Sequence, residues 1–357
     1  MNRINTVLVF VTLISSMLSC VQVYADGSVE ANKKVSPLFQ SSDPLILRIN
    51  APFRTIHRYR GKERPYQAAT MILTDVDGKE KSLDLKIRVR GNFRSDRENC
   101  RYPPLKLNFK RKSLKNTVFE GENKLKLVVQ CNKADRYKQF LILEYLNYKV
   151  FQLFTDYSLQ VRMARIDYYD SENNRDLGTW PAFFIEDTGR MAKRLNLEMV
   201  KEKKILPGDY DQARLNLVDL FEFFIGNTDW SSIAGEQEDN CCHNIIPYRD
   251  RGGPIIPVPY DFDMTGVVDP SYAVVNPKLR INSIRQRLYR GFCQPDAVLQ
   301  TTIKTFVDRR DKIYALYENQ AGLSKEKLKS AIKYYDDFYD IMQKEERLKW
   351  NILNKCR

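Results

Sequence analysis

The sequence predicts an α+β protein in which a strand-rich N-terminal lobe with one long helix precedes a helical C-terminal lobe. Two observations lead to this fold class. Apolar and polar residues alternate over much of residues 45–187, as in β-strands, whereas apolar residues recur at helical spacing over much of residues 188–357. The chain has 357 residues, of which 43% are hydrophobic, so a sizeable core can form in one large domain or two small ones.

The first 25 residues are typical of a secretory signal peptide. Arg3 precedes an apolar run at residues 7–18, and Val23 and Ala25 lie at the spacing of a cleavage site. A lipoprotein that carries its lipid on Cys20 is the alternative. Both routes predict an exported protein, periplasmic or secreted. No later stretch of the sequence is long and apolar enough to predict a membrane span.

Residues 26–44 are polar and lack periodicity, which predicts a flexible leader before ordered structure begins near Leu45. Strands are expected at residues 45–49, 69–74, 83–89, 105–109, 125–129, 161–168 and 182–185. The run Asp75-Val76-Asp77-Gly78 predicts a hairpin turn between two of these strands. A long helix is expected over residues 134–154, where apolar residues follow helical spacing.

In the C-terminal half, helices are expected at residues 209–225, 296–318 and 324–350, with short strands at 244–248 and 255–258. Asp209 and Ser324 are the candidate N-caps, and Gly322 closes the helix before Ser324. A strand-rich lobe (45–187) followed by a helical lobe (188–357) whose loops carry acids is the architecture of a two-lobed protein-kinase-like fold.

The formal net charge is +13, and loss of Arg3 with the signal peptide leaves +12. A basic surface favours acidic partners such as nucleotides, anionic lipid headgroups, phosphorylated chains or acidic glycans. The basic residues are spread along the chain without a nucleic-acid-binding motif, so no nucleic acid partner is expected.

Cysteine and histidine usage limits the possible chemistry. Without Cys20 an even number of cysteines remains, which favours disulfides in an exported chain. Cys100 and Cys131 flank neighbouring predicted strands and are expected to pair. The histidines are His57 and His243, and the sequence has no Cys-x-x-Cys, which argues against a zinc site. A Ser-His-Asp or Cys-His hydrolase would have to use His243 as its base.

Three polar side chains follow apolar elements in an order that suits phosphoryl transfer. Asp229 comes after a predicted helix, Asn244 stands beside a strand, and Asp261 lies where the next strand ends. The first acid can orient a hydroxyl group, while the amide and the second acid can hold magnesium. Asp263 is expected on the same side as Asp261, with Phe262 turned into the core. Read singly, each motif is typical of a turn.

A lysine and a glutamate complete this set. Lys106 alternates with Leu105 and Leu107 and is expected on the opposite strand face. Glu144 is a lone acid in an apolar helix, so we expect a cationic partner, with Lys106 as the candidate. A solvent-facing strand lysine and a glutamate on the exposed helix edge are the alternatives.

Two groups of arginines are candidates for binding anions. Arg88 and Arg90 end a predicted strand before a turn that can present guanidinium groups to phosphate oxygens. An ordinary hairpin on a basic surface is the alternative. Arg285, Arg287 and Arg290 form a later cluster, which is either a dock for an acidic acceptor or a solvated basic loop.

These motifs resemble those of the CotH-like family, the atypical kinases first known from bacterial spore coats. The matching residues are Arg88-x-Arg90-Gly91-Asn92, Leu105-Lys106-Leu107-x-Phe109, Gly226-Asn227-x-Asp229, His243-Asn244 and Pro259-x-Asp261-x-Asp263. The chain also resembles a branch of exported bacterial proteins with the motifs Thr228-Asp229-Trp230-Ser231 and Val258-Pro259-Tyr260-Asp261-Phe262-Asp263. The similarity covers residues 80–295 and is most specific between Gly226 and Asp263.

The resemblance implies an exported kinase that uses ATP and Mg²⁺ to phosphorylate protein or another hydroxyl-bearing envelope molecule. Asp229 would be the catalytic acid, and Asn244 and Asp261 the magnesium ligands. Asp263 could reach the same metal and would either orient the ligand Asp261 or cap the following turn at Thr265-Gly266. Lys106 would contact phosphate, and the segment around Glu186 would form the hinge under the adenine.

The sequence departs from the family pattern at an acidic insertion over residues 235–242, which separates Asp229 from Asn244. Kinase-like catalytic loops keep these two residues close. Two alternatives therefore stay open. One is a non-catalytic kinase-like module that binds an acidic envelope partner, and the other is nucleotidyl transfer on the same fold.

Overall fold

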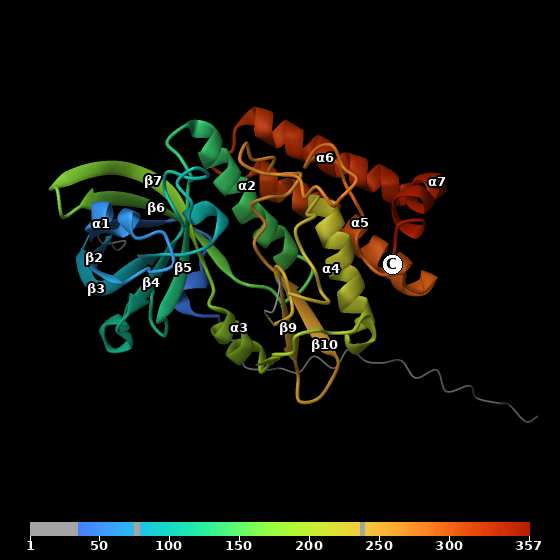
Figure 1. The fold of residues 1–357 in the computed structure, drawn as a ribbon, viewed down its shortest axis with the longest axis horizontal. Coiled ribbons are helices and arrows are strands. Elements are labelled where there is room, and N and C mark those ends of the chain that lie inside the picture. Colours follow the sequence, from blue (N-terminus) through green and yellow to red (C-terminus); the bar gives the residue numbers. More distant parts are fainter. Residues whose placement is uncertain (1–34, 75–78, 236–239) are drawn as a thin grey trace, which may run out of the picture.

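The computed structural model describes residues 35–74, 79–235 and 240–357 (Figure 1). The predicted signal peptide, Cys20, most of the predicted leader, the turn at residues 75–78 and the centre of the insertion at 236–239 lie outside the described residues. Within those three ranges, no helix has the length and apolar character needed to cross a membrane.

Strands of the N-terminal half close into a barrel (Figure 1). They are β1 (Leu45–Ala51), β2 (Gln67–Thr74), β3 (Glu80–Val89), β4 (Leu105–Phe109), β5 (Lys124–Val129), β6 (Val161–Asp170) and β7 (Arg175–Ile185). The order around the barrel is β1-β2-β3-β4-β5-β7-β6. Neighbours pair antiparallel except β1 and β6, whose parallel pairing closes the barrel.

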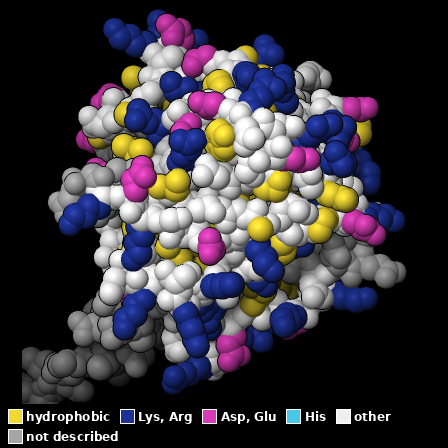
Figure 2. Space-filling view, turned by 90° about the vertical axis from the view of Figure 1, so that its left-hand side faces the viewer, with side chains coloured by type: hydrophobic (Ala, Val, Ile, Leu, Met, Phe, Trp, Pro, Cys, Tyr) yellow, Lys and Arg dark blue, Asp and Glu magenta, His cyan; other side chains and the backbone are white. Residues whose placement is uncertain are grey.

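The barrel interior is filled by the inward-facing side chains of these strands. In β4, Leu105, Leu107 and Phe109 are buried, as alternation predicted. The Phe119 ring stacks on Phe109 and meets Phe184 edge-on. The outer face carries many charged side chains, and Figure 2 shows Lys and Arg spread across this side of the molecule. A short helix, α1 (Phe53–Arg58), follows β1.

A second core lies between the outside of the barrel and the C-terminal helices. Helix α2 (Asp135–Gln152) lies between them (Figure 1). The other helices are α3 (Thr188–Leu195), α4 (Gln212–Ile225), α5 (Asp296–Glu318), α6 (Lys325–Gln343) and α7 (Glu345–Leu348). The core joins α2, α4, α5 and α6 to outward-facing barrel residues such as Val128 and Ile185. Strands β8 (Glu198–Met199), β9 (Ile245–Arg249) and β10 (Ile255–Pro259) form a separate antiparallel sheet.

The predicted two-lobed protein-kinase-like fold with a helical C-terminal lobe is wrong. The N-terminal strands form a closed seven-stranded barrel, and the C-terminal half contains a three-stranded sheet beside its helices. The expected strands and helices are present, although the helix expected to reach residue 350 ends at Gln343. The alternation of apolar and polar residues indicates that a segment is a strand, but it does not indicate which strands pair. Closure depends on β1 pairing with β6, which no local pattern encodes.

Capping and cross-linking were predicted in part. Ser324 caps α6 by accepting from the Lys327 amide, as expected, whereas α4 is capped by Asp211 and not by Asp209. The expected disulfide between Cys100 and Cys131 is present. The structure adds the disulfides Cys241–Cys242 and Cys293–Cys356.

Candidate functional site

A cleft of about 650 Å³ lies where the outer face of the barrel meets α2 and the C-terminal loops. Its walls contain six of the residues predicted for the site: Arg90, Glu144, Asp229, Asn244, Asp261 and Asp263. Lys106 and Glu186 are not among the described residues that line it. The cleft therefore brings the predicted acids and the amide together from segments far apart in sequence.

The end of α4 presents Asp229 to the cleft. Gly226 ends the helix with φ +70°, a left-handed conformation that favours glycine. A β-carbon at this position would lie 2.0 Å from the Tyr334 hydroxyl, so the close packing also requires glycine. The Asn227 side chain then accepts a hydrogen bond from the Asp229 amide at 2.9 Å. As a result, Asp229 stands on an ordered turn with its side chain 54% exposed.

His243 and Asn244 hold Asp229 in place. His243 Nε2 lies 2.9 Å from Asp229 Oδ1. Asn244 Nδ2 donates to the Asp229 carbonyl at 2.7 Å and lies 3.3 Å from Asp229 Oδ2. A bridge between Ser231 and His243 brings these two segments together despite the insertion between them. Because the amide nitrogen of Asn244 faces Asp229, its Oδ1 is the acceptor that remains for a ligand.

The two acids after β10 have different environments. Asp261 is exposed, and its amide donates to the Tyr148 hydroxyl at 3.0 Å. Phe262 is fully buried, as predicted, and packs on Tyr148. Asp263 is buried and accepts from Tyr272 at 3.3 Å. Burial raises the pKa of Asp263 to about 6, and the neighbouring charge of Asp261 adds to the rise.

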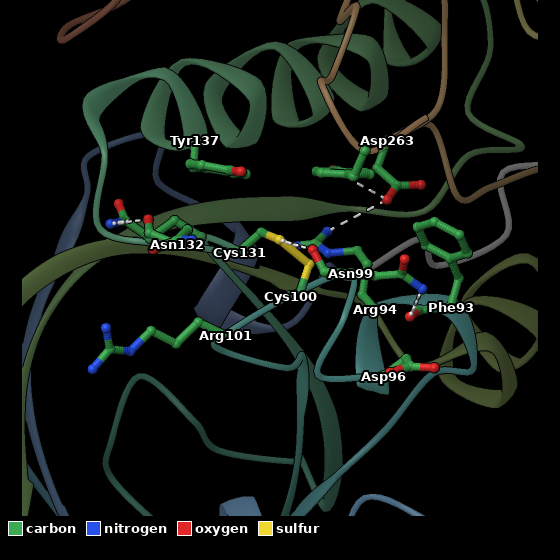
Figure 3. The surroundings of a disulfide bond; sticks show 12 residues. Phe93, Arg94, Asp96, Asn99, Cys100, Arg101, Cys131, Asn132, Tyr137 and Asp263 are labelled. Carbon is green, nitrogen blue, oxygen red and sulfur yellow. Dashed lines mark hydrogen bonds and ion pairs between the residues drawn. A yellow bond between two sulfur atoms is a disulfide. The ribbon is translucent and has the colours of Figure 1, made fainter. Parts of the chain in front are cut away.

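Glu144 is bound by Arg94, so the prediction that Lys106 is its partner is wrong. Arg94 Nη1 lies 3.1 Å from Glu144 Oε2 and 3.8 Å from Asp263 Oδ2. Figure 3 shows the arginine side chain directed toward Asp263. Burial raises the pKa of Glu144, and the Arg94 charge opposes that rise. Arg94 lies on the irregular segment between β3 and β4, where no periodicity marks a buried residue.

The lysine in the cleft wall is Lys126 on β5. It is paired in register with Lys106 on β4, so both lysines are on the same face of the sheet. Lys126 Nζ lies 5.2 Å from the Tyr260 ring centroid. Its pKa is lowered to about 8, chiefly by burial and then by Arg90, while Asp261 opposes the change. The alternation that identified Lys106 is also present around Lys126 and could have found it.

The Glu186 side chain binds Arg194 and does not line the cleft. Its carboxylate is bound by Arg194 Nε and Nη2, both at 2.9 Å, and accepts from the Gln160 amide at 3.1 Å. The preceding residue, Ile185, does line the cleft. The Glu186 side chain therefore fastens the end of β7, and the role of the segment around it stays a prediction.

The later arginine cluster supports the backbone instead of forming a free basic surface. Arg287 donates to the carbonyls of Phe223, Phe224 and Tyr334 and pairs with Asp337. Arg290 donates to the carbonyls of Thr228 and Trp230, on either side of Asp229. Arg285 pairs with Asp269 at 3.5 Å. Two of these three arginines thus stabilise the end of α4 and the turn that presents Asp229.

The cleft contains oxygen donors of the type that hard cations accept. Across the described residues, no group of three or more His, Cys, Asp and Glu side chains is placed to hold a metal ion. The cleft instead presents a mixed set of Asp261, Asp263 and Asn244. Asp263 already contacts Arg94 and Tyr272, which leaves the exposed Asp261 carboxylate and Asn244 Oδ1. Magnesium accepts such sites, with one or two protein oxygens completed by water and phosphate.

The arrangement can bind a polyanion and orient a hydroxyl group. A cationic wall with Lys126 faces the acids, and Val128 and Ile185 add an apolar surface that suits a flat ring. In comparisons with protein-family models, curated proteins and solved structures, nothing matched this chain.

Proposed function

We propose that this protein transfers a phosphoryl group from magnesium-bound ATP to a hydroxyl group on an exported protein or another envelope molecule. The supporting observation is that Asp229, Asn244, Asp261 and Lys126 line one cleft. Phosphoryl transfer depends mainly on positioning and charge neutralisation, which this combination of one cation, two acids and an amide can provide. The resemblance to the CotH-like family points to the same reaction class.

Asp229 is the residue proposed to act on the acceptor. Its carboxylate is exposed to the cleft, while its backbone carbonyl and both carboxylate oxygens are contacted by Asn244 and His243. A carboxylate fixed in this way can accept a hydrogen bond from an incoming hydroxyl group and orient its oxygen for attack. The acceptor proton would move toward Asp229 as the acceptor oxygen bonds to the γ-phosphorus, while the bond from that phosphorus to the β–γ bridging oxygen breaks and ADP leaves.

The nucleotide is proposed to lie across the cleft from the acceptor. Asp261 and Asn244 would hold Mg²⁺, which neutralises charge on the phosphate oxygens when bound. Lys126 would contact the phosphates, the role expected of Lys106 from sequence. Val128 and Ile185 supply an apolar wall for the adenine ring. Three disulfides fit the predicted export, because such bonds persist in oxidising compartments.

Binding and transfer can be tested separately. The full exported chain should gain thermal stability with MgATP, and a radiolabelled γ-phosphate should appear on an acceptor or on the protein itself. Asp229→Ala should abolish transfer but retain binding, because Asp229 is assigned to the acceptor. Asp250→Ala is the matched control, since Asp250 is an exposed acid in the turn between β9 and β10. If nucleotide stabilises the protein neither with nor without magnesium, the proposal fails.

A binding module for an acidic envelope polymer is the second candidate. Arg88, Lys106 and Lys126 are paired in register across β3, β4 and β5, which places a row of cations on one face of the sheet. Such a row favours an extended polyanion. Salt-sensitive retention on an anionic polymer that survives Asp229→Ala and Asp261→Ala would favour this candidate.

Mass spectrometry of the product would distinguish nucleotidyl from phosphoryl transfer, because the two added groups differ in mass.

A further inference from the structure

The loop between β3 and β4, residues 90–104, is fastened to the barrel beside the cleft. Its base is closed by a hydrogen bond from the Arg90 amide to the Pro104 carbonyl at 2.9 Å. Near its end, Cys100 forms a disulfide with Cys131, which follows β5 (Figure 3). The Tyr102 amide also donates to the Cys131 carbonyl at 3.0 Å. The disulfide therefore joins this loop covalently to the junction between β5 and α2.

The loop is ordered by hydrogen bonds within itself. The Cys100 amide donates to the Asp96 carbonyl at 3.0 Å, and the Asn99 side chain donates to the Phe93 carbonyl at the same distance. Arg94 lies in a short 3-10 turn, Phe93–Ser95, inside this bonded segment. These hydrogen bonds link the Cys100 end of the loop to the turn that contains Arg94.

Arg94 connects this loop to three other segments of the chain. It contacts Glu144 on α2 and Asp263 after β10, as described above. Its Nη2 donates to the Val129 carbonyl at the end of β5, two residues before Cys131. Only 10% of the Arg94 side chain is exposed, so these contacts are sheltered from solvent. Without the guanidinium group, the buried carboxylates of Glu144 and Asp263 would lose the cation that both of them contact.

We propose that Arg94 is a positioning residue for Asp261 and Asp263 in the cleft and that the Cys100–Cys131 disulfide holds Arg94 in place. Asp263 is two residues from Asp261 along the chain, so we expect a displacement of Asp263 to shift Asp261. The nucleotide measurement below rests on the proposed function, whereas the structural measurement does not.

The test compares two disulfides in the full exported chain. Cys100→Ser with Cys131→Ser removes the bond beside the cleft, and Cys293→Ser with Cys356→Ser is the matched control. The Cys293–Cys356 disulfide closes a longer loop than Cys100–Cys131, with a sequence separation of 63 against 31. Removal of Cys293–Cys356 should therefore lower the stability of the protein at least as much. Affinity for ATP is measured with and without magnesium. Hydrogen exchange is followed in the peptide that contains Asp261 and Asp263.

We expect the variant without Cys100–Cys131 to lose ~10–100-fold in magnesium-dependent nucleotide affinity, the range typical for residues that orient a ligand. Amide exchange near Asp261 should become faster in the same variant, because the Asp261 amide is held by Tyr148 in the intact cleft. The Cys293–Cys356 control should leave both readouts unchanged.

Variants of Arg94 separate positioning from general stability. Arg94→Met should lower magnesium-dependent affinity to the same extent as loss of Cys100–Cys131, and Arg94→Lys should restore part of it. Combining Arg94→Met with the serine pair should add no further loss, because both changes remove the same constraint.

Three results would overturn the inference. The first is that removal of either disulfide has the same effect on nucleotide affinity and on amide exchange. The second is that the affinity losses of Arg94→Met and the serine pair add in the combined variant. The third is that amide exchange near Asp261 does not change when Cys100–Cys131 is removed. If the unmodified protein binds no nucleotide, the proposed function fails. The exchange measurement still decides whether Arg94 and its disulfide hold Asp263 in place.

Discussion

Asp219 on α4 should make the stability of this protein depend on pH. Its side chain is fully buried, and its Oδ2 accepts a hydrogen bond from the Phe292 amide at 2.9 Å. Burial raises the pKa of this carboxyl from 3.8 to about 7, while the Phe292 amide and Arg357 oppose the rise. The other titratable groups around it are Tyr210, Glu222 and Tyr289.

The sign of the effect follows from proton binding. Between pH 4 and pH 7 the folded protein retains a proton that the unfolded chain has lost, so the contribution of Asp219 to stability falls as pH rises. One pKa unit corresponds to about 1.4 kcal/mol. A shift from 3.8 to about 7 therefore corresponds to about 4 kcal/mol in total, of which about 3 kcal/mol is lost between pH 5 and pH 8.

Asp219→Asn removes this titration and keeps a neutral side chain with an oxygen for the Phe292 amide. The difference in unfolding free energy between variant and unmodified protein should therefore shift by about 3 kcal/mol in favour of the variant between pH 5 and pH 8. Urea unfolding with the disulfides intact, followed by tryptophan fluorescence, measures this difference. Burial also raises the pKa of Glu222. Because Glu222 is present in both proteins, its contribution to the unfolding free energy largely cancels when the two are compared at the same pH.

Asp250→Asn is the control, because Asp250 is exposed. The shift of the difference with pH should be larger for Asp219→Asn than for this control. An Asp219→Asn difference that does not change between pH 5 and pH 8 would contradict this prediction, because burial would then not have raised the pKa of Asp219.

Lys126→Ala should weaken ATP binding ~10–100-fold, as expected for loss of a charge-assisted hydrogen bond. Lys106→Ala on the neighbouring strand should have a much smaller effect. Equal losses of affinity in the two variants, measured by calorimetry, would contradict the assignment of Lys126. Asp261→Asn should abolish magnesium-dependent binding, and Asp263→Asn should weaken it ~10–100-fold. Equal losses would make the two acids a shared ligand, and no loss in either variant would remove the metal from the mechanism.

Much of the candidate site could be predicted from sequence because its residues end regular elements. Asp229 follows a helix closed by Gly226, and Asp261 follows a strand, so chain direction places both at the ends of packed elements. The contact of His243 with Asp229 was not predicted. That contact crosses the insertion, and spacing alone says nothing about how an insertion folds.

The ion pair of Glu144 shows where the prediction failed. A buried carboxylate needs a cation, and the need was read correctly from the apolar helix around it. The choice of Lys106 was wrong because Arg94 reaches Glu144 from an irregular loop. Among several basic residues on different segments, only distances in the folded chain identify the partner.

The sequence by itself determined the local structure of this protein. Alternation located the strands, helical spacing located α2 and the C-terminal helices, and the positions of Cys100 and Cys131 beside neighbouring strands predicted their disulfide. Tertiary structure alone decided the closure of the barrel through β1 and β6, the placement of Lys126 in the cleft wall, and the clamp of Arg94 on Glu144 and Asp263. The physical reason is that periodicity depends on neighbours along the chain, whereas pairing and burial depend on residues that meet only after folding.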